Sequence, residues 1–182
     1  MRKSMTLLCL LLLAGCATPL EVGSITEIKP AGGVQGLDVY AARRTAGEPV
    51  PEFAGDQVLD VRTYAYLESS GEVEIAGATC EVTARDFTAT VQTPAKVRVP
   101  LYREKTSALS VSCAKVGFQK RLVVAEVFDV TRAQRMGAGG SGGLIGVTAA
   151  LIVDGMSDNS KNDWRYRPAR VVLLPANAAP TQ

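Results

Sequence analysis

Two glycine-rich motifs with known chemistry overlap near the middle of the second half of the chain. Gly137-Ala-Gly139-Gly-Ser-Gly142 fits G-x-G-x-x-G, a turn that binds dinucleotide phosphates when a strand and a helix flank it. Gly139-Gly-Ser141-Gly-Gly143 fits G-x-S-x-G, in which a histidine activates the serine of a hydrolase. The surrounding sequence has no βαβ pattern, and the chain has no histidine. We therefore expect neither a nucleotide cofactor nor a serine hydrolase.

The lack of histidine also limits every other kind of active site. It removes the usual general base and the commonest metal ligand together. The carboxylates Asp56, Asp60, Glu72 and Glu74 are scattered over strand-like and turn-like stretches and form no evident pair. We expect no catalytic residue, no metal and no cofactor, so the protein is expected not to be an enzyme.

The amino terminus has the pattern of an export signal. Arg2 and Lys3 precede an apolar run, Leu7–Leu13, which is far shorter than the roughly 20 residues that cross a bilayer. Leu13-Ala14-Gly15-Cys16 follows it and resembles the lipobox of bacterial lipoproteins. The resemblance implies cleavage before Cys16 and lipid on its thiol. The alternative is an ordinary secreted protein in which Cys16 is incidental.

Lipid on Cys16 implies membrane attachment, because each buried methylene contributes about 0.8 kcal/mol and several acyl chains hold firmly. Ala17 follows the cysteine, as in lipoproteins sent to the outer membrane, where an aspartate would retain them. We expect a lipid anchor in the cell envelope, at the outer membrane and facing the periplasm. Removing residues 1–15 removes two of the 20 basic residues and none of the 18 acidic ones. The neutral mature chain argues against nucleic acid as a partner.

Cys80 and Cys113 are the two cysteines that remain after export and lipidation. An even pair in an oxidising compartment favours a disulfide. Cys80 is in phase with Val82, and Cys113 is in phase with Val111, so both thiols should point into one core. Their bond would contribute roughly 4 kcal/mol by the loop-entropy relation. The alternative is two buried reduced cysteines.

A succession of short β-rich runs fills residues 34–130. These runs are separated by Gly, Pro, Ser and Asp: VQGLDVY, QVLDVRTYAYLE, TCEVTAR, FTATVQT, KVRVPLY, ALSVSCAKV and QKRLVVAEVFDV. Runs of this length, without a helical period, indicate an antiparallel sandwich or barrel. We expect an all-β protein, a small antiparallel β-sandwich of about seven strands.

The sequence also suggests how the chain is organised. The expected parts are a signal peptide 1–15, a tether 16–34, a β-sandwich 35–135, a glycine-rich segment 136–157, a basic and aromatic loop with the final strand 158–175, and a tail without ordered structure 176–182. For the tether, an edge strand near Val22–Ile28 is the alternative.

One stretch of the sandwich resembles a known family. It contains Gly77-Ala78-Thr79-Cys80, then Thr93-Pro94, then Leu109-Ser-Val-Ser-Cys113 and finally Gly117-Phe118. This arrangement resembles the PEGA-like domains of bacterial surface proteins, with Arg85-Asp86-Phe87 where an Asp-Gly turn is usual. The resemblance covers residues 75–120 and implies a small β-sandwich used for binding or scaffolding, with no catalytic residues.

Met136–Val153 carries no charge and repeats small residues four apart. Gly139 and Gly143 form one row, and Gly142, Gly146 and Ala150 form another. Such rows let helices approach closely in or against a membrane. The dense apolar part is only ten residues, too short to span a bilayer at about 1.5 Å per residue. A helical packing segment and a glycine loop followed by a buried element both stay open.

Two further groups of residues are candidate contact sites. Trp164, Arg165, Tyr166 and Arg167 interleave cations with aromatic rings, which suits lipid headgroups but equally a solvated loop. Tyr64 and Tyr66 share one face of an expected strand and would suit a glycan. We therefore expect a structural or assembly module that contacts another envelope protein or a second copy of itself. The alternative is a module that binds envelope glycan or lipid.

Overall fold

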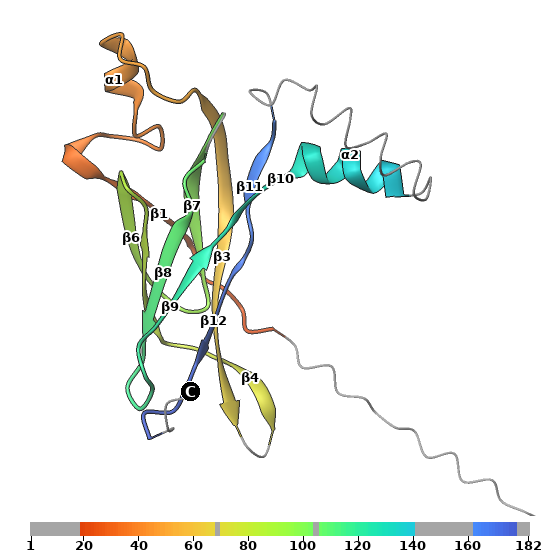
Figure 1. Ribbon diagram of the computed structural model, residues 1–182. Helices are drawn as coiled ribbons and strands as arrows, with labels where there is room; N and C mark the ends of the chain where they lie inside the picture. The colour runs from red at the N-terminus through yellow and green to blue at the C-terminus, as the bar shows by residue number, and fades with distance from the viewer. Residues whose placement is uncertain (1–18, 68–69, 104–105, 141–161, 178–182) are drawn as a thin grey trace, which may run out of the picture.

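Two β-sheets packed face to face make up the body of the protein. The computed structural model describes residues 19–67, 70–103, 106–140 and 162–177. Strands dominate these residues and helices are few (Figure 1). The expectation of an all-β sandwich is confirmed.

The first sheet is built around one long strand, β3 (Phe53–Leu67). Its first half pairs with β7 (Ala95–Tyr102), and its second half pairs with the hairpin partner β4 (Gly71–Ile75), both antiparallel. β12 (Ala169–Leu173) pairs with β3 on the other side, and β1 (Ile25–Glu27) extends the sheet beyond β7. These last two pairings are parallel, so the sheet is mixed rather than wholly antiparallel.

The second sheet is antiparallel throughout. Its order is β2 (Lys29–Pro30), β6 (Phe87–Gln92), β5 (Thr79–Thr83), β8 (Leu109–Ala114) and β9 (Arg121–Ala125). The turns before β5 and after β8 contain Gly77 and Gly117 at φ of +75° and +85°, a conformation that glycine adopts without steric cost. The chain crosses from the first sheet to the second between β1 and β2. At another point of contact, the Gln119 N–H after β8 donates to Leu174 O after β12.

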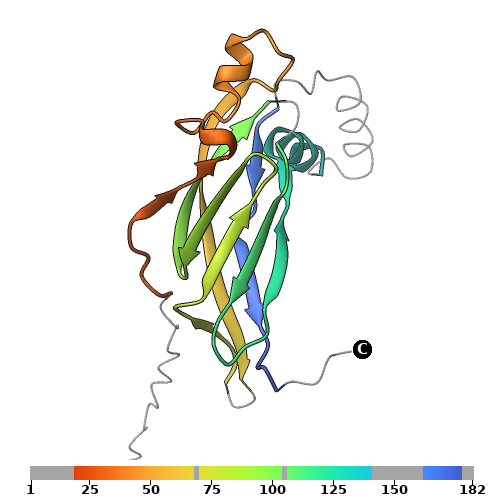
Figure 2. The same ribbon diagram turned by 90° about the vertical axis from the view of Figure 1, so that its left-hand side faces the viewer.

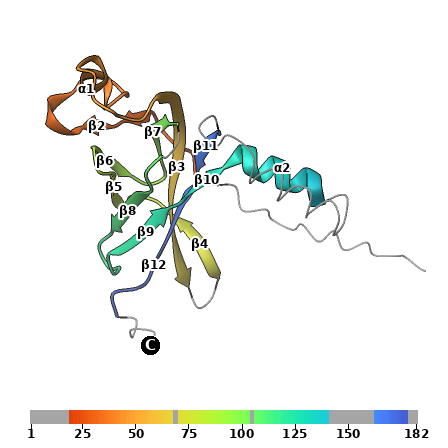
Figure 3. The ribbon, with the colours of Figure 1, turned by 45° about the horizontal axis from the view of Figure 1, so that its top comes forward.

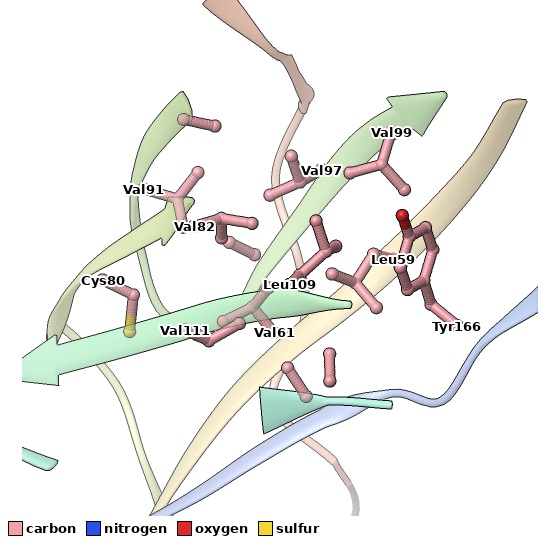
Figure 4. Packing of buried hydrophobic residues seen from close by; sticks show 14 of the residues in the cluster. Leu59, Val61, Cys80, Val82, Val91, Val97, Val99, Leu109, Val111 and Tyr166 are labelled. Atoms are coloured by element: carbon pink, nitrogen blue, oxygen red, sulfur yellow. The ribbon is translucent and has the colours of Figure 1, made fainter. Parts of the chain in front are cut away.

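The core lies between the sheets and follows the alternation of the strands. Aliphatic side chains from the two sheets face one another (Figure 4): Leu59, Val61, Val97 and Val99 from the first, and Val82, Leu109 and Val111 from the second. Each such side chain contributes about 1.5–3 kcal/mol by leaving water. Cys80 and Cys113 lie directly opposite each other on β5 and β8 and form a disulfide, as expected.

The strand expected over VQGLDVY is wrong. This segment follows a short helical turn, η1 (Ala31–Gly33), and leads into helix α1 (Ala41–Thr45) at one end of the sandwich. Asp38 explains the difference, because its carboxylate accepts the Tyr40 N–H at 3.2 Å and pairs with Arg44. A side chain that bonds local backbone and helix residues favours a turn over a strand.

Some boundaries also differ from those expected. β1 and β2 lie inside residues 16–34, the segment expected to be a tether, so the sandwich begins earlier. Pairing with β7 and β6 satisfies backbone groups that a free tether would leave to water. At the other end of the chain, Ala176 N donates to Gly117 O at 2.9 Å, so order extends past the expected boundary at residue 176.

A two-stranded ribbon and a helix stand beside the sandwich. β10 (Val127–Asp129) pairs with β11 (Trp164–Tyr166), and helix α2 (Val130–Gly140) projects away from the sheets (Figure 3). The helix begins six residues before the glycine-rich segment, because Asp129 Oδ1 accepts the Arg132 N–H at 2.9 Å as a cap. Gly139 lies in this helix. Gly142, Gly143, Gly146 and Ala150 lie outside the described residues.

Candidate functional site

A pocket of about 330 Å³ opens at the end of the sandwich that carries α1. Its walls come from the start of α1, the segment before β3, the β5–β6 turn, the end of β7 and β11. The polar side chains that matter most are Tyr40, Arg43, Arg85 and Asp86. The β5–β6 turn thus places Arg85 and Asp86 at the pocket, where the family resemblance would have an Asp-Gly turn.

Tyr40 and Asp86 form the central polar contact of the pocket. The Tyr40 hydroxyl donates to Asp86 Oδ2, although the two residues lie 46 positions apart in the chain. Burial, and then the bond to Asp86 with its negative charge, raises the pKa of Tyr40 to about 12. The Arg43 guanidinium lies over the ring of Tyr40, 5.6 Å from its centroid, which is a cation–π contact.

Tyr102 holds in place the segment before α1, which forms one wall of the pocket. Its hydroxyl accepts the Val39 N–H at 3.0 Å and donates to Asp38 Oδ1 at 3.4 Å. Its ring packs against Tyr40, with centroids 4.9 Å apart. The Tyr166 hydroxyl donates to Ser107 O at 2.8 Å. Burial raises the pKa of both Tyr102 and Tyr166, so each hydroxyl keeps its proton at neutral pH.

Two cations at this pocket face solvent. Arg43 is exposed and pairs with the exposed Glu48 at 2.7 Å. Arg85 is exposed and forms no ion pair or hydrogen bond within the described part of the chain. Two guanidinium groups beside one carboxylate suit a ligand that carries an acidic group next to a hydrogen-bond donor. Sequence reasoning missed this site, because Tyr40 and Asp86 lie 46 positions apart and meet only in the folded chain.

Tyr64 and Tyr66 lie far from the pocket, toward the other end of β3. Tyr66 is 59% exposed on the outer face of the first sheet, as a binding platform requires. The ring of Tyr64 is covered by the Arg170 guanidinium, 4.1 Å from its centroid, and Arg170 also pairs with Glu72. One of the two rings is therefore already occupied by the protein itself.

The expected basic and aromatic surface is divided among different contacts. Trp164–Tyr166 forms a strand rather than a loop, and Tyr166 is buried at the wall of the pocket, so it is not part of an exposed basic and aromatic surface. The Gln57 side chain holds it there: Nε2 donates to Tyr166 O at 2.9 Å, and Oε1 accepts the Tyr166 N–H at 2.8 Å. Arg165 pairs with Asp163, and Arg167 lies over the ring of Phe128 at 4.9 Å. Four neighbours in sequence thus have four separate environments.

A second hollow lies beside α2. It is lined by the half-buried Trp164, together with Asp129, Met136 and the buried Asn162. Both carboxylate oxygens of Asp129 already accept hydrogen bonds, Oδ1 from the Arg132 N–H as the cap of α2 and Oδ2 from Asn162 Nδ2 at 2.5 Å. Asp129 therefore has a structural role at the start of the helix.

Cys16, the expected lipidation site, lies outside the described residues. Within residues 19–67, 70–103, 106–140 and 162–177, no group of three or more Cys, Asp or Glu is arranged to hold a metal ion. In the same residues, neither α1 nor α2 has the length and apolar character needed to cross a bilayer. Comparison with models of protein families, with curated proteins and with solved structures gives no match to this chain.

Proposed function

We propose that this protein is a lipid-anchored cell-envelope lipoprotein that works as a non-catalytic binding module. The observation that supports this most is the opposite placement of the chain entry and the pocket. The amino-terminal segment joins the sandwich beside β4, away from α1 (Figure 2). The pocket lies at the α1 end. The entry point contacts Arg62, nine residues along β3 from Phe53, so about 30 Å of extended strand separates it from the α1 end of the sandwich. A lipid on Cys16 would therefore leave the pocket accessible from the periplasm.

The groups in the pocket favour binding over catalysis. Tyr40, Tyr102 and Tyr166 all have raised pKa values, so their hydroxyls stay protonated and serve as hydrogen-bonding groups. A tyrosine that acts as a base or nucleophile needs the opposite shift. The chain contains no histidine, which is compatible with a binding role but is not evidence for one.

The charges indicate an acidic envelope component as the ligand. Arg85 has no carboxylate partner among the described residues, and Arg43 shares an exposed pair with Glu48, which exchanges easily with a competing anion. We propose a carboxylate-bearing segment of another envelope protein or of a second copy. Such a contact agrees with the PEGA-like resemblance and with outer-membrane attachment, which are part of the same proposal.

Glycan binding is the second candidate. It rests on Tyr66, whose exposed ring could stack on a sugar face. It is the weaker candidate because Arg170 covers Tyr64, which leaves a single free ring rather than a platform of two.

Site-specific photo-crosslinking in cells tests the pocket. A photoreactive residue is placed at Ser107 beside the pocket, or at Thr90 on the exposed outer face of β6 as the matched control. We expect one discrete crosslinked species from position 107, none from position 90, and loss of the species when Arg85→Glu is added. Crosslinking that is equal at both positions, or that is unchanged by Arg85→Glu, would contradict a role for the pocket.

Palmitate labelling tests the anchor. The wild-type protein should incorporate palmitate and sediment with membranes, whereas Cys16→Ala should do neither. Normal processing and membrane retention of Cys16→Ala would refute the lipoprotein assignment.

A further inference from the structure

The point where the chain enters the sandwich is fixed by two hydrogen bonds. Leu20 N donates to Glu74 Oε2 at 3.0 Å, and Arg62 Nη1 donates to Leu20 O at 3.2 Å. Arg62 and Glu74 pair with each other at 2.6 Å, and their side chains are only 22% and 12% exposed. Leu20 is therefore held against β3 and β4 by a partly buried ion pair.

Very little chain separates this point from the lipidated cysteine. Ala17, Thr18 and Pro19 are the only residues between Cys16 and Leu20. Four fully extended Cα–Cα steps reach at most about 14 Å. If Cys16 carries the lipid, Leu20 must lie within that distance of the membrane surface. The expected tether of residues 16–34 is thus reduced to three residues.

The end of the sandwich next to Leu20 exposes the side chains that a lipid interface accepts. Tyr66 is 59% exposed, Leu67 40% and Leu20 39%, all at or beside the β3–β4 end. Tyrosine suits the headgroup level because its ring is apolar and its hydroxyl can stay hydrated. Two of the nearby acidic residues are balanced, since Glu72 pairs with Arg170 and Glu74 with Arg62, whereas Glu21 is exposed to solvent.

We infer that the β3–β4 end of the sandwich, through Leu20, Tyr66 and Leu67, rests on the lipid surface. This inference depends on the lipid anchor of the proposed function. It gives the domain a fixed posture: β3 stands away from the membrane, and the pocket at its other end points into the periplasm. Because the tether is short, the local concentration of these side chains at the membrane is high, and a small apolar contact is enough to hold this orientation.

Quenching of tryptophan by brominated lipid measures this posture directly. The acylated protein, in a Trp164→Phe background, is reconstituted into phosphatidylcholine vesicles with brominated acyl chains. One probe is Tyr66→Trp, and the matched control is Ala42→Trp on the exposed surface of α1. We expect the fluorescence of the Tyr66→Trp probe to fall roughly twofold relative to unbrominated vesicles, and that of the Ala42→Trp probe to stay unchanged.

The same preparation separates the two ways of failing. Mass spectrometry of the reconstituted protein shows first whether Cys16 is acylated. An unmodified Cys16 would overturn both the anchor and the posture. An acylated protein whose Tyr66→Trp probe is not quenched, or whose two probes are quenched equally, would overturn the posture alone and leave the anchor standing.

Discussion

Removing the Tyr102 hydroxyl should destabilise the protein more than removing any comparable hydroxyl near the pocket. In the wild-type protein the Val39 N–H donates to the Tyr102 hydroxyl at 3.0 Å, and both residues are only 6% exposed. Tyr102→Phe removes this acceptor. A buried donor left without a partner costs about 1–3 kcal/mol. We therefore expect the free energy of unfolding to fall by that amount.

Tyr166→Phe is the matched control. Its hydroxyl donates to the carbonyl of Ser107, an exposed residue, so water can replace the lost donor. The expected loss is about 0.5–1.5 kcal/mol, typical of a net hydrogen bond. Urea unfolding with unchanged m-values measures both variants, and hydrogen exchange at the Val39 N–H locates the effect. A loss for Tyr102→Phe no larger than that for Tyr166→Phe would refute the reasoning.

Three further perturbations test other parts of the structure. Gln57→Ala should lower the free energy of unfolding by about 1–3 kcal/mol, because the backbone N–H and C=O of Tyr166 lose their partner side chain. Hydrogen exchange at the Tyr166 N–H should become faster, and an unchanged exchange rate would contradict the contact. Cys113→Ser should lower stability by roughly 4 kcal/mol, and alkylation of the wild type before non-reducing electrophoresis should find no free thiol at Cys80 or Cys113. The difference in ultraviolet titration between wild type and Tyr40→Phe should have its midpoint at about 12. Since an unfolded tyrosine loses its proton near pH 10, the unfolded state binds fewer protons between these values, and the Tyr40 contribution to stability should fall as the pH rises through that window.

The sequence by itself determined the features that depend on neighbouring residues. Alternation of Val97 and Val99 with Lys96 and Arg98 predicts a half-buried strand, because successive side chains point to opposite faces, and this half of β7 has that burial pattern. The same rule put Cys80 and Cys113 in phase with core residues, and the structure joins them. β4 was not among the expected strands, although Glu72 and Glu74 alternate there with Val73 and Ile75; its five residues pair with β3.

Only the tertiary structure decided which distant segments meet. Tyr40 and Asp86 are 46 residues apart, and Gln57 and Tyr166 are 109 apart, so no local pattern relates them. The Asp38 turn replaced an expected strand because its partners, Arg44 and the Tyr102 hydroxyl, come from α1 and from the end of β7. The alternation along a strand determines which face of the sheet a side chain occupies. The tertiary packing determines which other segment covers that face, and the pocket forms where such distant segments meet.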